Sequence, residues 1–279
     1  MSLTNKSVVV ITGAASGIGR ALAIRLAQEN ISGLAISDLN EEGLANTREL
    51  IDNPNLKITT HIVDVASEGE MRSFAGDVIQ QHGRVTHVIN NAGAALGGAV
   101  SEVSVEDIRW LMDINFWGVV YGSKFFLPHL EKEDSAHIVN ISSLFGFIAP
   151  PGQATYCASK FAVRGFTESL RHELEKTNIA VSLVHPGGIN TNIVNNARIG
   201  ENVSLSEKEV EKRKAQENQN INRTSPEKAA ETILRGIKSK NPRILIGFDS
   251  WLLSTIARVF PKRYFSIIDL ISGGRLRSD

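Results

Sequence analysis

The stretch VVVITGAASGIGRALAIRLA, residues 8–27, joins a run of apolar residues to a helical pattern through a glycine-containing loop. Gly13, Gly17 and Gly19 permit tight turns and a close approach of the backbone to a ligand. A helix that begins near Gly17 presents unpaired N–H groups and the positive end of its dipole to that ligand. Three glycines alone would fit a structural turn, but this position favours binding of a dinucleotide pyrophosphate.

Similar short apolar runs alternate with longer helical patterns along the rest of the chain. Strands are predicted at 7–12, 34–38, 57–64, 85–90, 137–142, 180–186 and 243–247, and helices at 17–29, 41–52, 67–82, 104–132, 155–177 and 226–239. Strands that are apolar throughout are typical of parallel sheets covered on both faces. The sequence therefore predicts an α/β fold: one domain with a three-layer, doubly wound, Rossmann-like parallel sheet of about seven strands.

The composition is that of an ordinary globular protein, with 42% hydrophobic and 22% charged residues in a chain of 279. Its 30 Lys and Arg residues balance 30 Asp and Glu residues, so no net charge favours nucleic acid as a partner. The single cysteine, Cys157, excludes an internal disulfide and favours a reducing, cytoplasmic location. The seven histidines lack the spacing of metal ligands, so no metal site is expected.

Two segments depart from the alternation of strands and helices. The polar stretch 200–222 is interpreted as a solvated helix, within an insertion near 188–225 that is placed to cover a ligand crevice. The main domain is expected to span 1–250, followed by an apolar extension at 251–279. Charged residues and a proline divide this extension into pieces shorter than the ~20 residues that span a bilayer. Packing on the domain or on a partner subunit is favoured, and peripheral contact with a membrane is the alternative.

Asp38 ends the second predicted strand, LAISD, about twenty residues beyond the glycine loop, where a carboxylate can bind both hydroxyls of an adenosine ribose. It would repel a 2′-phosphate, and its neighbours Ser37, Leu39 and Asn40 supply no cation. NAD is therefore expected as the cofactor, and NADP is less favoured. The alternative is that Asp38 caps the helix that begins at Glu41.

Tyr156 and Lys160, in ATYCASKF at 154–161, lie four residues apart and share one face of a helix. A buried tyrosine beside a lysine is the ordinary explanation of such a pair taken alone. Lys160 supplies a positive charge beside the phenol, and the oxidised nicotinamide of the expected cofactor would add another. An opposite charge within about 4–6 Å can shift a pKa by ~1–3 units, which would bring the phenol toward ~7–8 from the usual ~10. A phenol with that pKa could accept the proton of an alcohol. The pair therefore predicts acid–base chemistry if further polar partners accompany it.

Such partners are found in a set of motifs that together resemble the short-chain dehydrogenase/reductase family, over residues 6–247. The motifs are TGAASGIG (12–19), NNAG (90–93), Asn115, Ser143, YCASK (156–160) and HPGG (185–188). Their glycine spacing resembles that of the NAD-preferring oxidoreductases of the family. The resemblance also implies a homodimer or homotetramer.

The resemblance implies four catalytic residues. Tyr156 would be the acid–base group, and Lys160 would stabilise its phenolate and bind the nicotinamide ribose. Ser143, rather than Ser142, would bind the substrate oxygen, and Asn115 would hold a water to Lys160. The alternative for Asn115 is a polar residue at a helix bend.

The resemblance also implies a set of cofactor contacts, with the adenine near Asp64 and Val65 and the nicotinamide carboxamide near Ile189 and Thr191. Asn91 and Gly93 would lie along the ribose. The complete expected set is Gly13, Ser16, Gly17, Ile18, Gly19, Asp38, Asp64, Val65, Asn91, Ala92, Gly93, Tyr156, Lys160, Pro186, Gly187, Ile189 and Thr191.

The substrate pocket is expected beyond the strand ends, lined by 94–100, 144–153 and 187–200. These segments contain no Lys or Arg before Arg198, and the middle one is apolar, which favours a neutral, hydrophobic alcohol or ketone. The expected activity is NAD-dependent hydride transfer between such a secondary alcohol and its ketone. An NADP-dependent carbonyl reductase is the alternative within the family. A non-redox lyase or isomerase and a nucleotide-binding scaffold are the alternatives from other classes.

Overall fold

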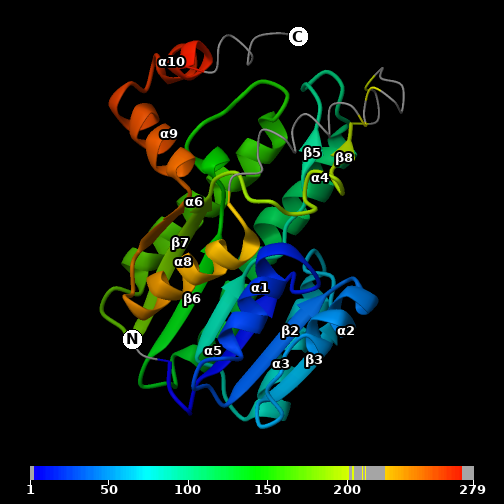
Figure 1. Ribbon diagram of the computed structural model, residues 1–279, viewed down its shortest axis with the longest axis vertical. Helices are drawn as coiled ribbons and strands as arrows, with labels where there is room; N and C mark the ends of the chain where they lie inside the picture. Colours follow the sequence, from blue (N-terminus) through cyan, green and yellow to red (C-terminus); the bar gives the residue numbers. More distant parts are fainter. Residues whose placement is uncertain (1–2, 201–202, 204–208, 210, 212–223, 272–279) are drawn as a thin grey trace.

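The computed structural model describes residues 3–200, 203, 209, 211 and 224–271. A seven-stranded parallel sheet lies at its centre, in the order β3-β2-β1-β4-β6-β7-β9 (Figure 1). The strands are β1 (Val8–Thr12), β2 (Gly33–Asp38), β3 (Lys57–Ile62), β4 (His87–Asn90), β6 (Ala136–Ile141), β7 (Ile179–Pro186) and β9 (Arg243–Ile246). The predicted doubly wound parallel sheet is confirmed.

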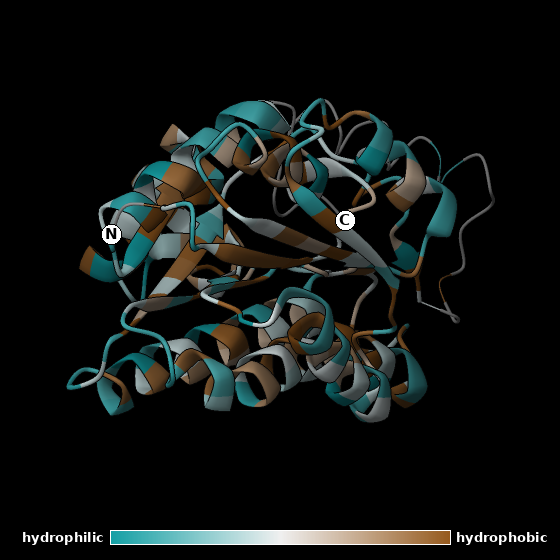
Figure 2. Ribbon diagram, turned by 90° about the horizontal axis from the view of Figure 1, so that it is seen from below, coloured by the Kyte–Doolittle hydropathy of each residue, from teal (hydrophilic) through white to brown (hydrophobic). Residues whose placement is uncertain are grey.

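Helices cover both faces of this sheet, which lies between them when seen edge-on (Figure 2). One face carries α1 (Gly17–Leu26), α2 (Glu41–Glu49) and α8 (Pro226–Lys238), and the other carries α3 (Glu68–His82), α5 (Gly118–Leu130) and α6 (Ala154–Glu173). Residues of β1 alternate between the two layers, with Val9 and Ile11 on the first face and Val10 on the second. Because both faces are dry, the strand is apolar at every position.

The helix predicted over 104–132 is interrupted in the structure. It consists of α4 (Val105–Met112), a π-helical turn at Asp113–Trp117 and α5. The wider turn places Asn115 in the interior with no solvent exposure. Such π-helical turns frequently mark functional sites, and their register cannot be read from apolar periodicity.

The strand order reverses between β1 and β4, so the loops that follow these two strands diverge and leave a crevice at the carboxyl edge of the sheet. Beyond that edge, the short strands β5 (Leu96–Gly97) and β8 (Arg198–Ile199) pair with each other. This pairing joins two of the segments expected to line a substrate pocket. Most of 200–222 lies outside the described residues, so the expectations for that stretch remain predictions.

The expected apolar extension begins inside α9 (Phe248–Val259) and continues through α10 (Tyr264–Ile271). Leu253 and Ile256 of α9 and Ile268 of α10 pack with Leu144 and Ile148, which belong to the loop after β6. Leu144 begins a 3₁₀ turn there (η2, Leu144–Gly146). Both helices therefore pack on the loop that follows β6. Across the described ranges, no helix has the length and apolar character needed to cross a bilayer.

Candidate active site

The glycine loop between β1 and α1 is packed so tightly that side chains would not fit. A Cβ on Gly13, where φ is +69°, would lie 2.6 Å from the Cα of Ala92. A Cβ on Gly19 would lie 2.1 Å from the carbonyl oxygen of Gly13. Ser16 occupies the N-cap position of α1, but its side chain makes no capping hydrogen bond. The first turn of α1, which includes Ile18, therefore keeps backbone donors for an anion, as a pyrophosphate site requires.

The loop after β4 holds the glycine loop in place. Thr12 Oγ1 accepts hydrogen bonds from the backbone N–H groups of Asn91 and Ala92, each at 3.1 Å. The Asn91 amide donates to the carbonyl oxygens of Thr12 at 2.9 Å and Gly13 at 3.0 Å. The side chain of Asn91 thus shapes the loop, and Thr12 is a supporting residue that the sequence analysis did not identify.

Asp38 lies half-buried at the end of β2, beside the glycine loop. Its Oδ2 accepts a hydrogen bond from the Ala15 N–H at 2.9 Å, and its Oδ1 accepts one from the Asn40 N–H at 3.0 Å. Helix α2 is capped by Asn40, whose Oδ1 accepts from the Gly43 N–H at 2.8 Å. The alternative interpretation of Asp38 as the helix cap is therefore wrong.

Arg20 is the cation closest in sequence to the loop, and its guanidinium is bound on the side of α2. Its Nε donates to Thr47 Oγ1 at 3.0 Å, and its terminal nitrogen donates to the carbonyl oxygens of Ala15 and Gly43. These bonds fasten α1 and the glycine loop to α2. The Arg20 guanidinium is consequently engaged by one hydroxyl and two carbonyl oxygens of the protein.

The other residues expected at the cofactor lie at the carboxyl ends of β3, β4 and β7. Asp64 follows β3, and its Oδ1 accepts from the Ala66 N–H at 2.9 Å. Pro186 ends β7, and the Gly187 N–H donates to the carbonyl oxygen of Ile246 at 2.9 Å. Thr191 lies next to the glycine loop, since a Cβ on Gly17 would be 3.1 Å from its Cγ2.

Two further members of this set are packed against neighbouring backbone or side chains. Val65 is buried beside Gly118 at the start of α5, where a Cβ would lie 3.0 Å away. Ile189 is buried and forms a parallel bridge with Thr224. These residues follow strands of the same parallel sheet, at the carboxyl edge where the strand order predicts the cofactor crevice.

Ser143, Tyr156 and Lys160 come together just beyond the carboxyl end of β6. Ser143 follows the strand by two residues, and its side chain lies close enough to the Tyr156 phenol, in the first turn of α6, to lower the pKa of that phenol. Lys160, one turn further along α6, is 4% exposed, and its Nζ lies 5.7 Å from the centroid of the tyrosine ring. Gly93 adjoins the group, because a Cβ there would lie 3.4 Å from Lys160 Nζ and 3.1 Å from Asn115 Oδ1.

Burial governs the pKa values of this pair in the protein chain. It raises the pKa of Tyr156 to about 12, partly offset by the Ser143 side chain, and lowers the pKa of Lys160 to about 8. The pKa shift of the phenol that the protein chain produces by itself is thus upward, and the expectation that Lys160 and the nicotinamide of NAD together lower it remains a prediction. Loss of hydration disfavours the charged form of each residue. The phenolate requires additional positive charge at this site.

The adjacent serines face different ways. Ser142 Oγ donates to the carbonyl oxygen of Lys160 at 2.9 Å, which ties β6 to α6. The carbonyl oxygen of Ser143 accepts a hydrogen bond from His185 Nδ1 at 2.8 Å. Burial lowers the pKa of His185 to about 4, and its ring packs on Phe147 with centroids 3.9 Å apart. His185 therefore supports Ser143 as a neutral donor, a function that only the pairing of β6 with β7 reveals.

Asn115 connects the pocket segment 94–100 to α6. Its Oδ1 accepts from the Ala94 N–H at 2.8 Å, and its Nδ2 donates to the Ala94 carbonyl oxygen at 3.1 Å and to Ser159 Oγ at 3.0 Å. Ser159 in turn donates to the carbonyl oxygen of Tyr156 at 2.7 Å. The Asn115 side chain thus positions the backbone around Tyr156, and its predicted water contact remains a prediction.

Cys157, next to Tyr156, is buried in the same wall. Its thiol donates to the carbonyl oxygen of Ile148 at 3.7 Å, and burial raises its pKa to about 11. The thiol is consequently protonated at neutral pH and acts as a small packing group, as the sequence suggested.

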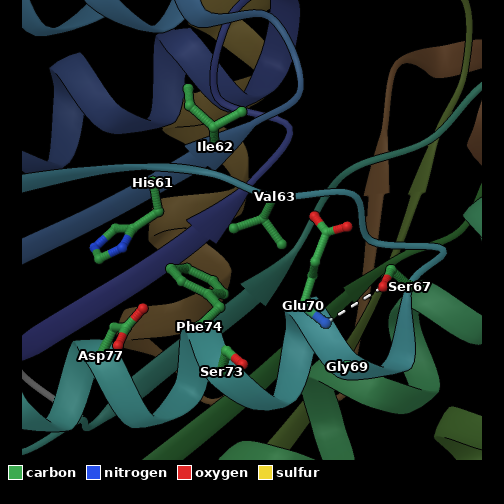
Figure 3. Close-up of a pocket in the computed structure, with 9 residues that line it drawn as sticks. All are labelled: His61, Ile62, Val63, Ser67, Gly69, Glu70, Ser73, Phe74 and Asp77. Atoms are coloured by element: carbon green, nitrogen blue, oxygen red, sulfur yellow. Dashed lines mark hydrogen bonds between the residues drawn. The ribbon is translucent and has the colours of Figure 1, made fainter.

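A separate open cavity of about 500 Å³ lies between β3 and α3 (Figure 3). His61, Val63 and Phe74 surround its apolar part, and Glu70 and Asp77 supply carboxylates. None of the predicted catalytic or cofactor residues lines it. The cavity is therefore distinct from the site at the carboxyl ends of β1, β4 and β6.

The chain is similar to known proteins over most of its length. A family model described as short chain dehydrogenase matches residues 7–202. The putative oxidoreductase SadH of Mycobacterium tuberculosis (strain H37Rv) is 41% identical over 272 residues, which cover 96% of each chain. A 3-ketodihydrosphingosine reductase of Bacteroides thetaiotaomicron is 33% identical, covering 84% of this chain and 85% of the relative.

Similarity to solved structures extends over the whole chain. A short-chain dehydrogenase/reductase from Burkholderia phymatum, crystallised in complex with NAD, has a TM-score of 0.82 and 26% identity, covering 100% of this chain and 99% of that one. A short-chain dehydrogenase from Mycobacterium paratuberculosis bound to NAD has a TM-score of 0.74 and 26% identity, covering 88% and 97%.

Proposed function

Because the chain belongs to the short-chain dehydrogenase family, whose oxidoreductases act on CH–OH groups with NAD(P), we propose that it interconverts a neutral, hydrophobic secondary alcohol and its ketone with NAD. The observation that supports this most directly is the convergence of three groups beyond β6: Ser143 follows that strand, and Tyr156 and Lys160 share one face of α6, with Lys160 Nζ 5.7 Å from the tyrosine ring. A proton acceptor, a donor for the substrate oxygen and a cation are the groups that alcohol oxidation requires.

The crevice would accept a dinucleotide, because glycines stand where side chains would collide and because Asp38 lies beside the glycine loop, where a carboxylate can bind ribose hydroxyls. Bound NAD supplies a hydride acceptor and the positive charge of its nicotinamide ring. The Tyr156 phenolate oxygen takes the hydroxyl proton of the alcohol as the C–H bond breaks. The Ser143 hydroxyl donates to the substrate oxygen throughout. Lys160 stabilises the phenolate, and reduction of a ketone reverses the proton transfer.

NAD is proposed over NADP because of the groups around the ribose position. Asp38 would repel a 2′-phosphate, and the guanidinium of Arg20 is already bound to Thr47 and to two carbonyl oxygens. Ser16 and Asn40, which adjoin the loop and the end of β2, are uncharged. The two solved relatives bound to NAD are consistent with this preference.

A neutral, hydrophobic substrate is proposed because the surroundings of Tyr156 are apolar. Phe145 meets the tyrosine ring edge-on with centroids 6.0 Å apart. Leu96 belongs to the hydrophobic cluster against which Tyr156 packs. Arg198 does not offer an anion site, because its guanidinium binds Asp107 at 3.2 Å and lies on the Trp110 ring at 4.3 Å. The name of the Bacteroides relative, a reductase of 3-ketodihydrosphingosine, supports a long-chain ketone as the first class to test.

The assignment of the base is tested with Tyr156→Phe, using Tyr121→Phe as the control for loss of a phenol hydroxyl. We expect Tyr156→Phe to lower kcat by about 10²–10⁴-fold while NAD affinity changes little, because the hydroxyl transfers the proton and the loop binds the nucleotide. Turnover is followed by nicotinamide absorbance near ~340 nm over a panel of long-chain, cyclic and aliphatic alcohols. Undiminished activity would disprove the role of Tyr156, and turnover without an absorbance change would indicate a lyase or isomerase.

A further inference from the structure

Helix α9 is apolar on two opposite sides. Leu253 and Ile256 face inward and pack with the loop after β6. Phe248, Trp251 and Val259 are 72%, 52% and 59% exposed, and their spacing places them together on the outer side. An apolar stripe on a helix is ordinarily covered by another element or by a partner. The outer side of α9 therefore exposes apolar side chains of the kind that another surface would ordinarily cover.

Helix α10 and the turn before it carry further exposed apolar residues. Phe260 is 50% exposed, and Leu270 and Ile271 at the end of α10 are 81% and 62% exposed. Residues 248–271 thus supply six of the thirteen exposed large hydrophobic residues in the part of the chain that the structure describes. In Figure 1 both helices extend beyond the carboxyl edge of the sheet, away from the helical layers. Apolar residues gathered in this way mark an interaction surface.

The exposed charges on this surface have one sign. Arg258, Lys262 and Arg263 are exposed, whereas Asp269 is buried and Asp249 turns inward to accept a hydrogen bond from the Gly188 N–H at 2.7 Å. Since the chain has no net charge, this positive charge is local. A second copy of the chain would bring the same three cations to the interface, where they would repel one another. Anionic lipid headgroups would instead attract them.

We propose that the outer surface of α9 and α10, within residues 248–271, docks on an anionic lipid bilayer. A helix of 12 residues is about 18 Å long and one of 8 residues about 12 Å, against about 30 Å for the hydrocarbon core. The two helices therefore lie in the interface, with aromatic and aliphatic side chains inserted and the cations at the level of the headgroups.

The docking surface adjoins the catalytic residues. Tyr264 of α10 accepts a hydrogen bond at its hydroxyl oxygen from the Ala149 N–H at 3.2 Å, and Ile268 packs with Leu144 directly after Ser143. A bilayer bound here would lie next to the segment expected to line the substrate pocket. Access of a membrane-dissolved alcohol or ketone to that pocket rests on the proposed function, whereas docking itself does not.

The test is flotation of the full chain with vesicles of phosphatidylcholine alone and with vesicles that also contain phosphatidylglycerol. We expect the wild type to float with the anionic vesicles. Joint replacement Trp251→Ser and Phe260→Ser should reduce partitioning more than about tenfold. Joint replacement Lys262→Gln and Arg263→Gln should reduce it about fivefold for each charge, on anionic vesicles only.

The control is Leu50→Ser, at an exposed leucine after α2, which should partition like the wild type. Far-UV circular dichroism of each variant verifies the fold without reference to a cofactor, so failure of docking is distinguishable from failure of the proposed oxidoreductase activity. Absence of wild-type flotation, or equal flotation of all variants, would overturn the proposal. So would a wild-type dimer, measured by light scattering, that dissociates in the Trp251/Phe260 variant without any vesicle binding, because a second copy would then cover the surface.

Discussion

Asp38 illustrates how a single side chain can decide between two cofactors. Both of its oxygens are oriented by backbone N–H groups, from Ala15 and from Asn40, so the carboxylate is fixed beside the glycine loop. A carboxylate oriented in this way retains acceptor capacity for ribose hydroxyls and keeps its negative charge facing the crevice.

Replacing Asp38 with Ala should therefore weaken NAD and relieve the penalty on NADP. We expect the ratio of kcat/KM with NAD to kcat/KM with NADP to fall by about 10–100-fold, since a hydrogen bond to a charged group contributes about 1.5–3 kcal/mol. Steady-state kinetics with both cofactors measure the ratio, and Asp52→Ala, at an exposed carboxylate, is the control. An unchanged ratio would show that Asp38 does not select the cofactor.

Residue types and spacing were enough to predict which side chains would gather, but not their environment. Ser143, Tyr156 and Lys160 could be grouped because a motif places them after one strand and on one face of one helix. The direction of the Tyr156 pKa shift depends on burial, which a sequence does not specify. The supporting contacts of His185 and Ser159 likewise depend on the pairing of separate elements.

At the scale of elements, a buried polar ladder joins the middle of the sheet to the helix that carries Tyr156. Asn90 Nδ2 donates to Asn140 Oδ1 at 2.8 Å across β4 and β6, and Asn140 Nδ2 donates to Thr167 Oγ1 of α6 at 3.0 Å. All three residues are at most 2% exposed. Polar groups buried so deeply are stable only while their partners remain.

Asn140→Ala should therefore lower the free energy of unfolding by about 1–3 kcal/mol, because it removes two buried hydrogen bonds, one with Asn90 and one with Thr167. Urea unfolding measures the change, with Asn55→Ala, at an exposed loop asparagine, expected to stay within about 0.5 kcal/mol of the wild type. A loss for Asn140→Ala as small as that of the control would mean that the ladder contributes little.

Elements with strong local patterns were predictable, and those defined by tertiary contacts were not. The seven strands of the main sheet follow from apolar runs bounded by turn residues. The π-helical turn at Asp113–Trp117 has no such pattern, since the surrounding helical periodicity continues through it. The pair β5 and β8 exists only because distant segments meet, at two residues each.

For the molecule as a whole, three buried histidines make the fold sensitive to acid. Burial lowers the pKa of His87 and His185 to about 4 and that of His137 to about 3, against 6.5 for a free histidine. Below pH ~6.5 the unfolded chain binds protons that the folded chain does not bind. The free energy of unfolding is therefore not reduced by these histidines above about pH 6.5. It decreases as the pH falls from there toward their pKa values in the folded protein.

Stability should consequently fall by about 1.4 kcal/mol per pH unit for each buried histidine between about pH 6 and about pH 4. Urea unfolding at several pH values measures the slope, and His87→Gln should reduce it by one histidine equivalent. The control is His172→Gln, at an exposed histidine, which should leave the slope unchanged. A slope that His87→Gln does not reduce would exclude His87 as a source of the acid sensitivity.

The position of Cys157 allows the rate at which its thiol is labelled to report a local opening of the protein. The only thiol of the chain lies one residue from Tyr156, protonated and bonded to a carbonyl of the loop on which α10 packs. A thiol reagent can reach it only when the start of α6 separates from that loop, so the labelling rate gives the free energy of this local opening. A ligand that binds only the closed form slows labelling in proportion to its occupancy. Labelling kinetics would therefore rank ligands of the pocket before any turnover is observed.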